Sequence, residues 1–439
     1  MNRLAIIDGI RTPFIKAGTL FKDLPAYELG RLVVSEIVAR TGIDKNTIDE
    51  VIMGCVGQPA EAANVARVIA LNAGIPERVP ARTVHRNCAS GLESITSAYE
   101  QMLAGRGEVF IVGGAESMSN YPMLFPKTAS ENFAVLQRAK TLGEKLKAFV
   151  NFRPADFRPQ IAVILGLTDP TCGMIMGDTA EVLAKEFHVA REEQDKFSLA
   201  SHQKVVASRE KLREEMMTVY LDGTTGRGDP RGRPKGGSNQ FVIDDNGVRE
   251  GQTMEALGKL RPIFDRKFGT VTAGNSSQIT DGAVALLVMS EAKAKALDYK
   301  PLGYLQHYSY AGLDPRRMGL GPAYAIPLAL RKAGRKLSDM QLIEINEAFA
   351  VQVMACEQLL ASKKFAKEHL NQVEPVGEID RAKLNVNGGA VALGHPVGAT
   401  GARVVLTLLK ELQRRNQQIG IASLCVGGGQ GAALVLERN

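Results

Sequence analysis

The sequence contains no apolar run that approaches the roughly 20 residues of a membrane-spanning helix. No basic leader or cleavage site precedes the apparent strand at residues 4–7, which argues against secretion and predicts a cytoplasmic protein. The chain has only five cysteines, an odd number without CxxC spacing. This argues against a disulfide framework or a zinc site and favours a reducing compartment.

Nucleic acid is not an expected partner either. The net charge of +7 comes from dispersed basic residues, and no nucleic-acid-binding motif is present. What remains is the composition of an ordinary globular protein, with 45% hydrophobic and 23% charged residues. At 439 residues the chain is long enough for two or three domains with sizeable cores.

Two parts of the chain repeat one order of elements. Cys88 precedes a helical pattern and then a strand at residues 109–112, and His395 precedes a helical pattern and then a strand at residues 419–424. Helical spacing that alternates with short β-branched runs is typical of α/β layers. The similarity is either the chance likeness of generic α/β patterns or a duplication. A duplication would place Cys88 and His395 at equivalent helix N-termini, facing one another.

We therefore predict an α/β fold with two similar halves. The N-terminal half comprises residues 1–117 and 264–290, and the C-terminal half comprises residues 291–439. Residues 118–263 do not follow the repeated order and are predicted to form an inserted loop domain. Its basic loop, residues 226–236, is either merely solvated or lies near phosphates.

Residues 131–150 of the insertion predict one amphipathic helix. Apolar side chains from Val135 to Phe149 share a face, and basic side chains such as Arg138 and Lys145 lie largely on the other. A basic amphipathic helix often rests on a membrane surface or a partner protein. The alternative is a plain surface helix that packs on its own domain.

The stretch around His395 is the most unusual in the chain. Residues 385–401 place five glycines and a proline around this one histidine. Glycine permits positive φ and close approach to a ligand, and proline fixes the turn that follows the histidine. The pattern predicts a ligand-facing loop, although a glycine-rich turn with an incidental histidine has the same composition.

Three further residues are candidates for chemistry. Cys88 opens a helix among small residues, where the helix macrodipole favours the thiolate and a low pKa, unless the thiol is inert filler. Cys425 ends a strand before a glycine-rich turn that leads into another strand, which excludes a dinucleotide loop and favours backbone N–H groups for an oxyanion. Asn346 ends a strand before an apolar helix, where a helix N-cap is the alternative role.

Taken together, these motifs resemble the thiolase family. The resemblance covers nearly the whole chain, in family order, and rests on DGIRTPF at residues 8–14, NCASG at 87–91, GGAESMS at 113–119, NEAFA at 346–350, NVNGGAVALGHPVGATGAR at 385–403 and LCVGGGQGAA at 424–433. It implies a duplicated α/β/α/β/α layered fold with an inserted loop domain.

The resemblance also implies the roles of individual residues. Cys88 matches the nucleophile that is acylated, His395 its base, and Cys425 the second, acid/base cysteine. Asn346 matches the residue that holds a water at the thioester oxygen of the enolate. The N–H groups of Cys88 and Gly427 match an oxyanion hole. Coenzyme A is implied as co-substrate, with no metal and no tightly bound cofactor, and its pantetheine would contact Met176, Ser277, Ala348 and Phe349.

The implied activity is that of an acetyl-CoA C-acyltransferase. Such an enzyme cleaves 3-ketoacyl-CoA with CoA to acetyl-CoA and a shortened acyl-CoA, as in fatty-acid β-oxidation. The same residues catalyse the reverse condensation, so a short-chain acetoacetyl-CoA thiolase is the alternative. A decarboxylating ketosynthase is disfavoured because such enzymes generally use two histidines and lack a second catalytic cysteine. Intact catalytic positions also argue against a lipid-binding relative without activity.

The insertion points to one subfamily. Residues 120–177 resemble the insertion in the β subunit of the fatty-acid β-oxidation trifunctional complex. This implies a hydratase/dehydrogenase α subunit as partner and peripheral membrane contact through residues 131–150.

Two features depart from that subfamily, which tends to have histidine in place of Asn346 and a less glycine-rich second-cysteine motif. Ile175 replaces a histidine common in short-chain biosynthetic enzymes. Acyl chain length is therefore left open, and the family implies a homodimer or tetramer.

Overall fold

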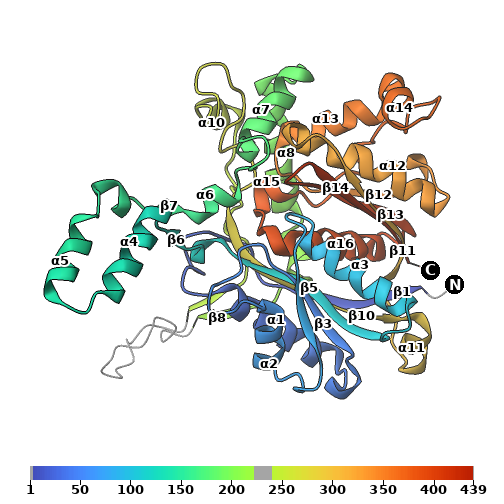
Figure 1. Cartoon of the computed structure of the whole chain (residues 1–439). Coiled ribbons are helices and arrows are strands. Elements are labelled where there is room, and N and C mark those ends of the chain that lie inside the picture. The colour runs from blue at the N-terminus through green and yellow to red at the C-terminus, as the bar shows by residue number, and fades with distance from the viewer. Residues whose placement is uncertain (1–2, 222–239, 439) are drawn as a thin grey trace.

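The computed structural model describes residues 3–221 and 240–438. The predicted basic loop, residues 226–236, lies outside them. The chain forms a layered α/β body from which a helical arm projects, and the two termini lie side by side (Figure 1). Arg3 joins the terminal segments through an ion pair of 3.2 Å with Glu437.

One large mixed sheet runs through the body. β2 (Ile15–Lys16) pairs with β10 beside the main path. The main path of neighbouring strands is β12 (Leu342–Ile345), β13 (Ile419–Val426), β14 (Gln430–Glu437), β11 (Gly303–Gly312), β1 (Leu4–Arg11), β10 (Thr280–Ser290), β5 (Val109–Ser117), β3 (Glu50–Gly54) and β4 (Ala81–Val84).

The two ends of this sheet have the same topology. From β1 outward, the pairings with β10 and β5 are antiparallel, and those of β5 with β3 and of β3 with β4 are parallel. From β11 outward, β14 and β13 pair antiparallel, β12 pairs parallel, and a parallel bridge joins Ile343 to Leu384 where the next strand would lie. β1 and β11 meet antiparallel at the centre. The duplication predicted from the sequence is confirmed, although the domain boundaries stay predictions.

Five layers follow from this arrangement. α3 (Ser90–Leu103) and α16 (Val397–Arg414) pack on each other between the two halves of the sheet. α1 (Ala26–Thr41) and α2 (Val65–Asn72) cover the outer face of the first half. α12 (Gly321–Ala333) and α13 (Ala350–Leu360) cover the outer face of the second. Each layer boundary is an apolar cluster, which is why α16, enclosed on all sides, is buried along nearly its whole length.

Two glycines explain how α3 and α16 come so close. A Cβ on Gly91 would lie 2.6 Å from the backbone nitrogen of Ala402, and a Cβ on Gly401 would lie 2.4 Å from that of Leu92. Any larger side chain at either position would meet backbone atoms, which cannot move aside cheaply. The close crossing brings the N-terminal ends of the two helices together, and with them the motifs that contain Cys88 and His395.

The remaining helices and strands complete the body. They are η1 (Lys45–Thr47), η2 (Met118–Asn120), α6 (Ala162–Gly166), α7 (Met176–Glu186), α8 (Arg191–Ala207), α9 (Arg209–Arg213), β8 (Val219–Leu221), β9 (Gln240–Val242), α10 (Met254–Gly258), α11 (Glu291–Ala296), η4 (Pro315–Leu320), η5 (Leu337–Asp339), α14 (Lys363–His369) and α15 (Ala390–Leu393).

A buried arginine fixes part of the inserted segment to the first strand. Arg11, at the end of β1, is fully buried and forms ion pairs of 2.7 Å with both Glu215 and Asp245. Removing one partner of such a buried pair typically costs about 3–5 kcal/mol. The DGIRTPF motif therefore holds Glu215 and Asp245 against the first strand, although they lie more than 200 positions further along the chain.

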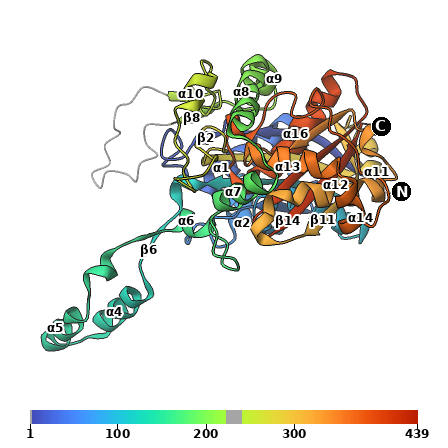
Figure 2. The same cartoon turned by 90° about the horizontal axis from the view of Figure 1, so that it is seen from above.

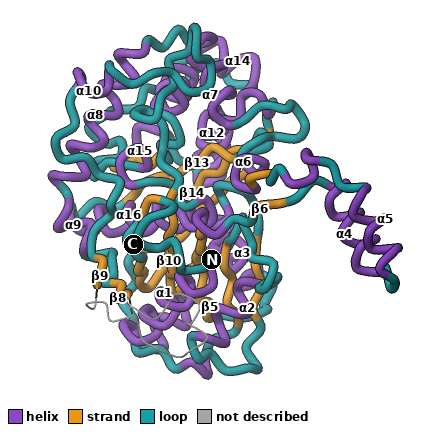
Figure 3. Tube along the Cα trace, turned by 90° about the vertical axis from the view of Figure 1, so that its left-hand side faces the viewer, coloured by secondary structure: helices purple, strands orange, loops and turns teal. Residues whose placement is uncertain are grey.

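The arm is a helical hairpin on a two-stranded neck. β6 (Met123–Leu124) and β7 (Gln160–Ile161) form the neck, and α4 (Lys127–Arg138), α5 (Leu142–Val150) and η3 (Pro154–Phe157) form the tip. α4 and α5 pack on each other and project away from the body (Figures 2 and 3).

The single helix predicted for residues 131–150 is wrong. The chain turns at residues 139–141, where Thr141 accepts a hydrogen bond from the Glu144 N–H and caps a second helix. Packing on the domain's own surface is also contradicted, because the helices extend away from the body. Several apolar side chains remain exposed on them, namely Val135 at 50%, Leu142 at 75%, Leu146 at 61% and Phe149 at 62%.

Candidate active site

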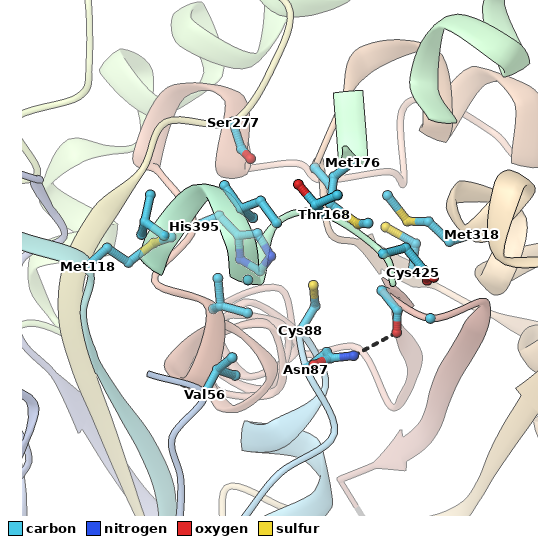
Figure 4. A pocket seen from close by; sticks show the side chains of 18 of the residues that line it. Val56, Asn87, Cys88, Met118, Thr168, Met176, Ser277, Met318, His395 and Cys425 are labelled. Carbon is cyan, nitrogen blue, oxygen red and sulfur yellow. Dashed lines mark hydrogen bonds between the residues drawn. The ribbon is translucent and has the colours of Figure 1, made fainter. Parts of the chain in front are cut away.

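A cavity of about 430 Å³ opens between the two halves, at the N-terminal ends of α3 and α16. Cys88, His395 and Cys425 line it together, although they come from three segments far apart in the sequence (Figure 4). Gly427, two residues after Cys425, lines it as well. Apolar atoms make up most of its wall. Such a cavity, with a few convergent reactive groups, is the usual form of a small-molecule site.

Cys88 lies two residues before the first residue of α3. The preceding residue, Asn87, has φ +42°, a left-handed conformation that turns the chain sharply before the thiol. Burial raises the pKa of the Cys88 thiol, and the N–H groups of Gly427 and of Cys88 itself only partly oppose this. The low pKa predicted from the helix N-terminus is therefore wrong, because loss of solvation outweighs the local dipoles.

One hydrogen bond of the His395 imidazole specifies its tautomer. Its Nδ1 lies 2.6 Å from Thr400 Oγ1, and the Thr400 hydroxyl lies 3.0 Å from the carbonyl oxygen of Pro396. Because a hydroxyl has one hydrogen and this one is donated to Pro396, we assign Nδ1–H as the donor to Thr400. Nε2 is then an unprotonated base, without a hydrogen-bond partner among the described residues.

The imidazole is also neutral. Burial, together with the positive charge of Arg403, lowers the pKa of His395 to about 3. The ring therefore carries no charge at neutral pH, which suits a base that accepts a proton from a neutral thiol.

Cys425 and Gly427 flank the end of β13. Cys425 is fully buried, and burial raises its pKa well above that of an ordinary thiol, with the neighbouring Cys88 contributing. The turn continues through Gly428 and Gly429, which have φ +86° and +75°. The N–H of Gly427 reaches the Cys88 sulfur and stabilises negative charge there. Two backbone donors, from Cys88 and Gly427, therefore converge on one point.

Asn346 lies behind the cavity wall rather than on it. Its side chain is 1% exposed, yet neither Oδ1 nor Nδ2 bonds to any residue that the structure describes. A buried amide without partners typically binds an ordered water. The N-cap role considered for this residue is wrong, since α13 begins at Ala350 with Phe349 at the N-cap.

The four residues expected to contact coenzyme A all line the cavity: Met176, Ser277, Ala348 and Phe349. Ile175, which replaces a histidine of short-chain relatives, is the residue before α7. Sequence reasoning missed a second group of lining residues, which extends from the base of the arm: Val163, Gly166, Leu167, Thr168, Asp169, Pro170 and Thr171. The apolar run at residues 161–167 was their only signal in the sequence.

The carboxylate of Glu116 organises the loops around the site. It is fully buried at the end of β5 and accepts hydrogen bonds from the N–H groups of Val56, Gly57 and Gly398, and from the Tyr121 hydroxyl. Burial raises its pKa, while these hydrogen bonds act in the opposite direction. The glutamate of the GGAESMS motif thus ties the first half to the start of α16, next to His395.

Within the described residues, no group of three or more His, Cys, Asp and Glu side chains is placed to hold a metal ion. Among the same residues, no helix is both long and apolar enough to cross a membrane. The cavity instead offers two thiols, one neutral imidazole and convergent backbone N–H groups. These are the parts of a site for covalent acyl transfer through a thioester.

Comparison with known proteins agrees with this chemistry. Residues 4–292 match the family described as "Thiolase, N-terminal domain", and residues 299–438 match "Thiolase, C-terminal domain". The chain is 43% identical over 439 residues to a 3-ketoacyl-CoA thiolase of Pectobacterium carotovorum, covering 99% of this chain and 97% of that protein.

Solved structures give the same picture. The acetyl-CoA acetyltransferase of Bacillus anthracis superimposes with a TM-score of 0.83 at 37% identity, covering 100% of this chain and 99% of that one. Human mitochondrial 3-ketoacyl-CoA thiolase in complex with CoA superimposes with a TM-score of 0.83 at 34% identity, covering 100% and 98%.

Proposed function

The chain belongs to the thiolase family and has its fold, and from this premise we propose that it cleaves 3-ketoacyl-CoA with CoA to acetyl-CoA and a shortened acyl-CoA. The observation that carries the proposal is the meeting of two cysteines and one neutral histidine in a single, largely apolar cavity. Purified protein should turn over 3-ketoacyl-CoA repeatedly only when CoA is present, because CoA is needed to remove the acyl group from Cys88. Absence of cleavage at every acyl chain length would refute the proposal.

Acylation of Cys88 is the first step. His395 Nε2 accepts the thiol proton as the sulfur attacks the 3-keto carbon, so the high pKa of the resting thiol is overcome only when substrate is bound. The N–H groups of Cys88 and Gly427 receive the negative oxygen that develops on that carbon. The carbon–carbon bond then breaks, which leaves the acyl group on Cys88 and releases an acetyl-CoA enolate.

Cys425 completes the cycle by moving a proton in both directions. Its raised pKa keeps it protonated until the enolate carbon, a far stronger base, takes its hydrogen. The resulting thiolate then accepts the proton of the incoming CoA thiol. The CoA sulfur attacks the acyl-enzyme, and Cys88 leaves with a proton returned by His395.

Asn346 acts on the enolate through a bound water. Its unpartnered, buried amide has donor and acceptor atoms available for that water. Together with His395, the water would hold the thioester oxygen as it becomes negative. A water in this position would satisfy a buried amide that has no partner among the described residues, an arrangement that otherwise costs about 1–3 kcal/mol.

The acyl chain is proposed to lie against the segment at the base of the arm. Val163 and Leu167 add apolar surface to one side of the cavity, and Met176 and Phe349 line it near the expected pantetheine. An assay against 3-ketoacyl-CoAs of increasing length measures the preference directly. Activity confined to acetoacetyl-CoA would favour the short-chain alternative, in which two acetyl-CoA molecules are condensed.

We further propose that the arm is a docking surface. Its tip presents exposed apolar side chains together with Arg138, Lys140, Lys145 and Lys147 on helices that do not pack on the body. Removing residues 127–151 and joining the neck should spare turnover of acetoacetyl-CoA. It should weaken binding to anionic liposomes or to a hydratase/dehydrogenase α subunit, and unchanged binding to both would refute the proposal.

Assembly and location follow from the family and stay proposals. We propose a homodimer or a tetramer, in the cytoplasm, with peripheral membrane contact through the arm. Sedimentation of the purified protein tests the first point. Fractionation of cells that express the intact and the armless chain tests the second.

A further inference from the structure

One side chain next to the nucleophile has no part in the mechanism above, yet it joins the two halves at the reaction centre. Asn87 Nδ2 donates a hydrogen bond of 2.7 Å to the carbonyl oxygen of Gly427 (Figure 4). Asn87 immediately precedes Cys88, and Gly427 supplies the second N–H of the proposed oxyanion hole. Asn87 and Cys88, which are adjacent in one half, therefore contact the carbonyl and the N–H of Gly427 in the other half.

We propose that Asn87 is a positioning residue that sets the distance between the two oxyanion-hole donors. The inference rests on the proposed thiolysis, because an oxyanion forms only in acyl transfer. The Asn87 amide holds Gly427 by its carbonyl, and the Gly427 N–H is thereby directed at the Cys88 sulfur. Asn87 itself does not touch the reacting atoms.

The glycine turn needs such a tether because its own backbone is permissive. Gly428 and Gly429 both have positive φ, and a Cβ on Gly427 would have no atom closer than 3.4 Å. Glycine has more accessible backbone conformations than any other residue, so the N–H of this turn is not oriented by the local sequence. An oxyanion donor is effective only when it is preorganised.

The backbone of Asn87 is itself fixed by hydrogen bonds. The Asn87 carbonyl oxygen accepts hydrogen bonds from the Ser90 N–H at 3.0 Å and from the Ser90 hydroxyl at 2.7 Å. Arg86 adds a second link between the halves through a 3.2 Å bond to Gln430 Oε1. The Asn87 side chain that binds the Gly427 carbonyl is thus fixed to the start of α3, the same helix that positions Cys88.

A simpler role for Asn87 predicts a different outcome. Asparagine tolerates the left-handed region better than most residues, and the φ of +42° alone would justify its presence. Glycine and aspartate tolerate this conformation as well, but neither can donate a hydrogen bond from its side chain to the Gly427 carbonyl. Asn87→Gly and Asn87→Asp therefore keep the backbone conformation and remove the tether.

The experiment compares two reactions of the same thiol. Acylation of Cys88 by 3-ketoacyl-CoA, followed in single turnover, passes through an oxyanion, whereas alkylation by iodoacetamide does not. Removing an oxyanion donor outright costs about 100- to 1000-fold in rate, so we expect displacing one to slow acylation about 10- to 100-fold. The limiting alkylation rate at high pH should stay within about twofold of the wild type.

Asn371→Gly is the matched control. Asn371 is exposed and has φ +53°, so this variant repeats the backbone change away from the cavity and should leave both rates unchanged. Wild-type acylation in Asn87→Gly would overturn the inference, and so would an equal loss of acylation and alkylation, which indicates a displaced thiol. A wild-type protein without thiolysis would instead refute the proposed function.

Discussion

The variant Thr400→Val tests whether one hydroxyl sets the protonation of His395, the proposed catalytic base. Thr400 is fully buried, and its Oγ1 lies 2.6 Å from Nδ1 of His395. Valine has nearly the same shape but cannot accept the Nδ1 hydrogen. The active tautomer, with Nε2 free to take a proton from Cys88, would then lack the interaction that favours it.

The expected loss of activity follows from the Nδ1–H of His395, which Thr400→Val leaves without an acceptor. A buried donor without a partner costs about 1–3 kcal/mol, which corresponds to a factor of about 5 to 150 in the tautomer equilibrium. We expect kcat/KM for thiolysis to fall within this range. Folding should be affected less, because the Pro396 carbonyl that loses the hydroxyl still accepts the N–H groups of Ala399 and Thr400 at 2.9 and 3.0 Å.

The assay combines kinetics with a direct view of the ring. The chain has only six histidines, so selective ¹⁵N labelling allows the His395 nitrogens to be assigned by substitution. Wild-type protein and the control Thr400→Ser should show Nδ1 protonated and Nε2 free, and Thr400→Val should lose this preference together with activity. Wild-type kcat/KM in Thr400→Val, or a wild-type protein protonated on Nε2, would refute the reasoning.

Four further predictions address other parts of the molecule. Burial raises the pKa of Cys88, so its alkylation by iodoacetamide should still accelerate up to about pH 9, and a plateau by about pH 7 would contradict the structure. Asn346→Ala should lower kcat about 100- to 1000-fold, as for other lost oxyanion interactions, while an unchanged kcat would remove this residue from the mechanism. Leu167→Trp narrows the cavity and should reduce kcat/KM for long 3-ketoacyl-CoAs more than for acetoacetyl-CoA, and an equal loss for both would argue against an acyl subsite there. Burial lowers the pKa of His202 to about 4, so as the pH falls from about 6.5 to 4 the unfolded state binds a proton at this histidine and the folded state does not. Over that window, the free energy of unfolding of the wild type should fall by up to about 1.4 kcal/mol per pH unit relative to His202→Gln, as measured by urea unfolding. Parallel curves of unfolding free energy against pH for the two proteins would contradict this.

Cys88 shows where sequence reasoning about chemistry ended. The identities and order of Cys88, Asn346, His395 and Cys425 were visible as motifs, and the structure brings three of them to one cavity with Asn346 behind it. The ionisation of Cys88 was not visible. A helix N-terminus alone favours the thiolate, but the degree of burial decides the pKa, and burial depends on residues hundreds of positions away.

The arm shows a similar limit in secondary structure. The periodicity of residues 131–150 is compatible with one amphipathic helix, and the pattern does not reveal that the chain reverses at residues 139–141. The Thr141 and Glu144 pair at that point is a recognisable capping box, so a closer look at local signals would have found the break. That both helices then leave the body is a property of the neck and not of their own sequence.

By itself, the sequence determined the α/β class and the duplication and pointed to candidate reactive residues, because periodicity and motif chemistry are local properties of the chain. The tertiary structure decided which groups meet and in what state. The Thr400 bond that directs the histidine proton lies within one motif, five residues from His395, whereas the close contact of α3 and α16 at two glycines and the Asn87 bond across the halves join distant segments. Such contacts exist only once the two halves have packed, and so no local pattern encodes them.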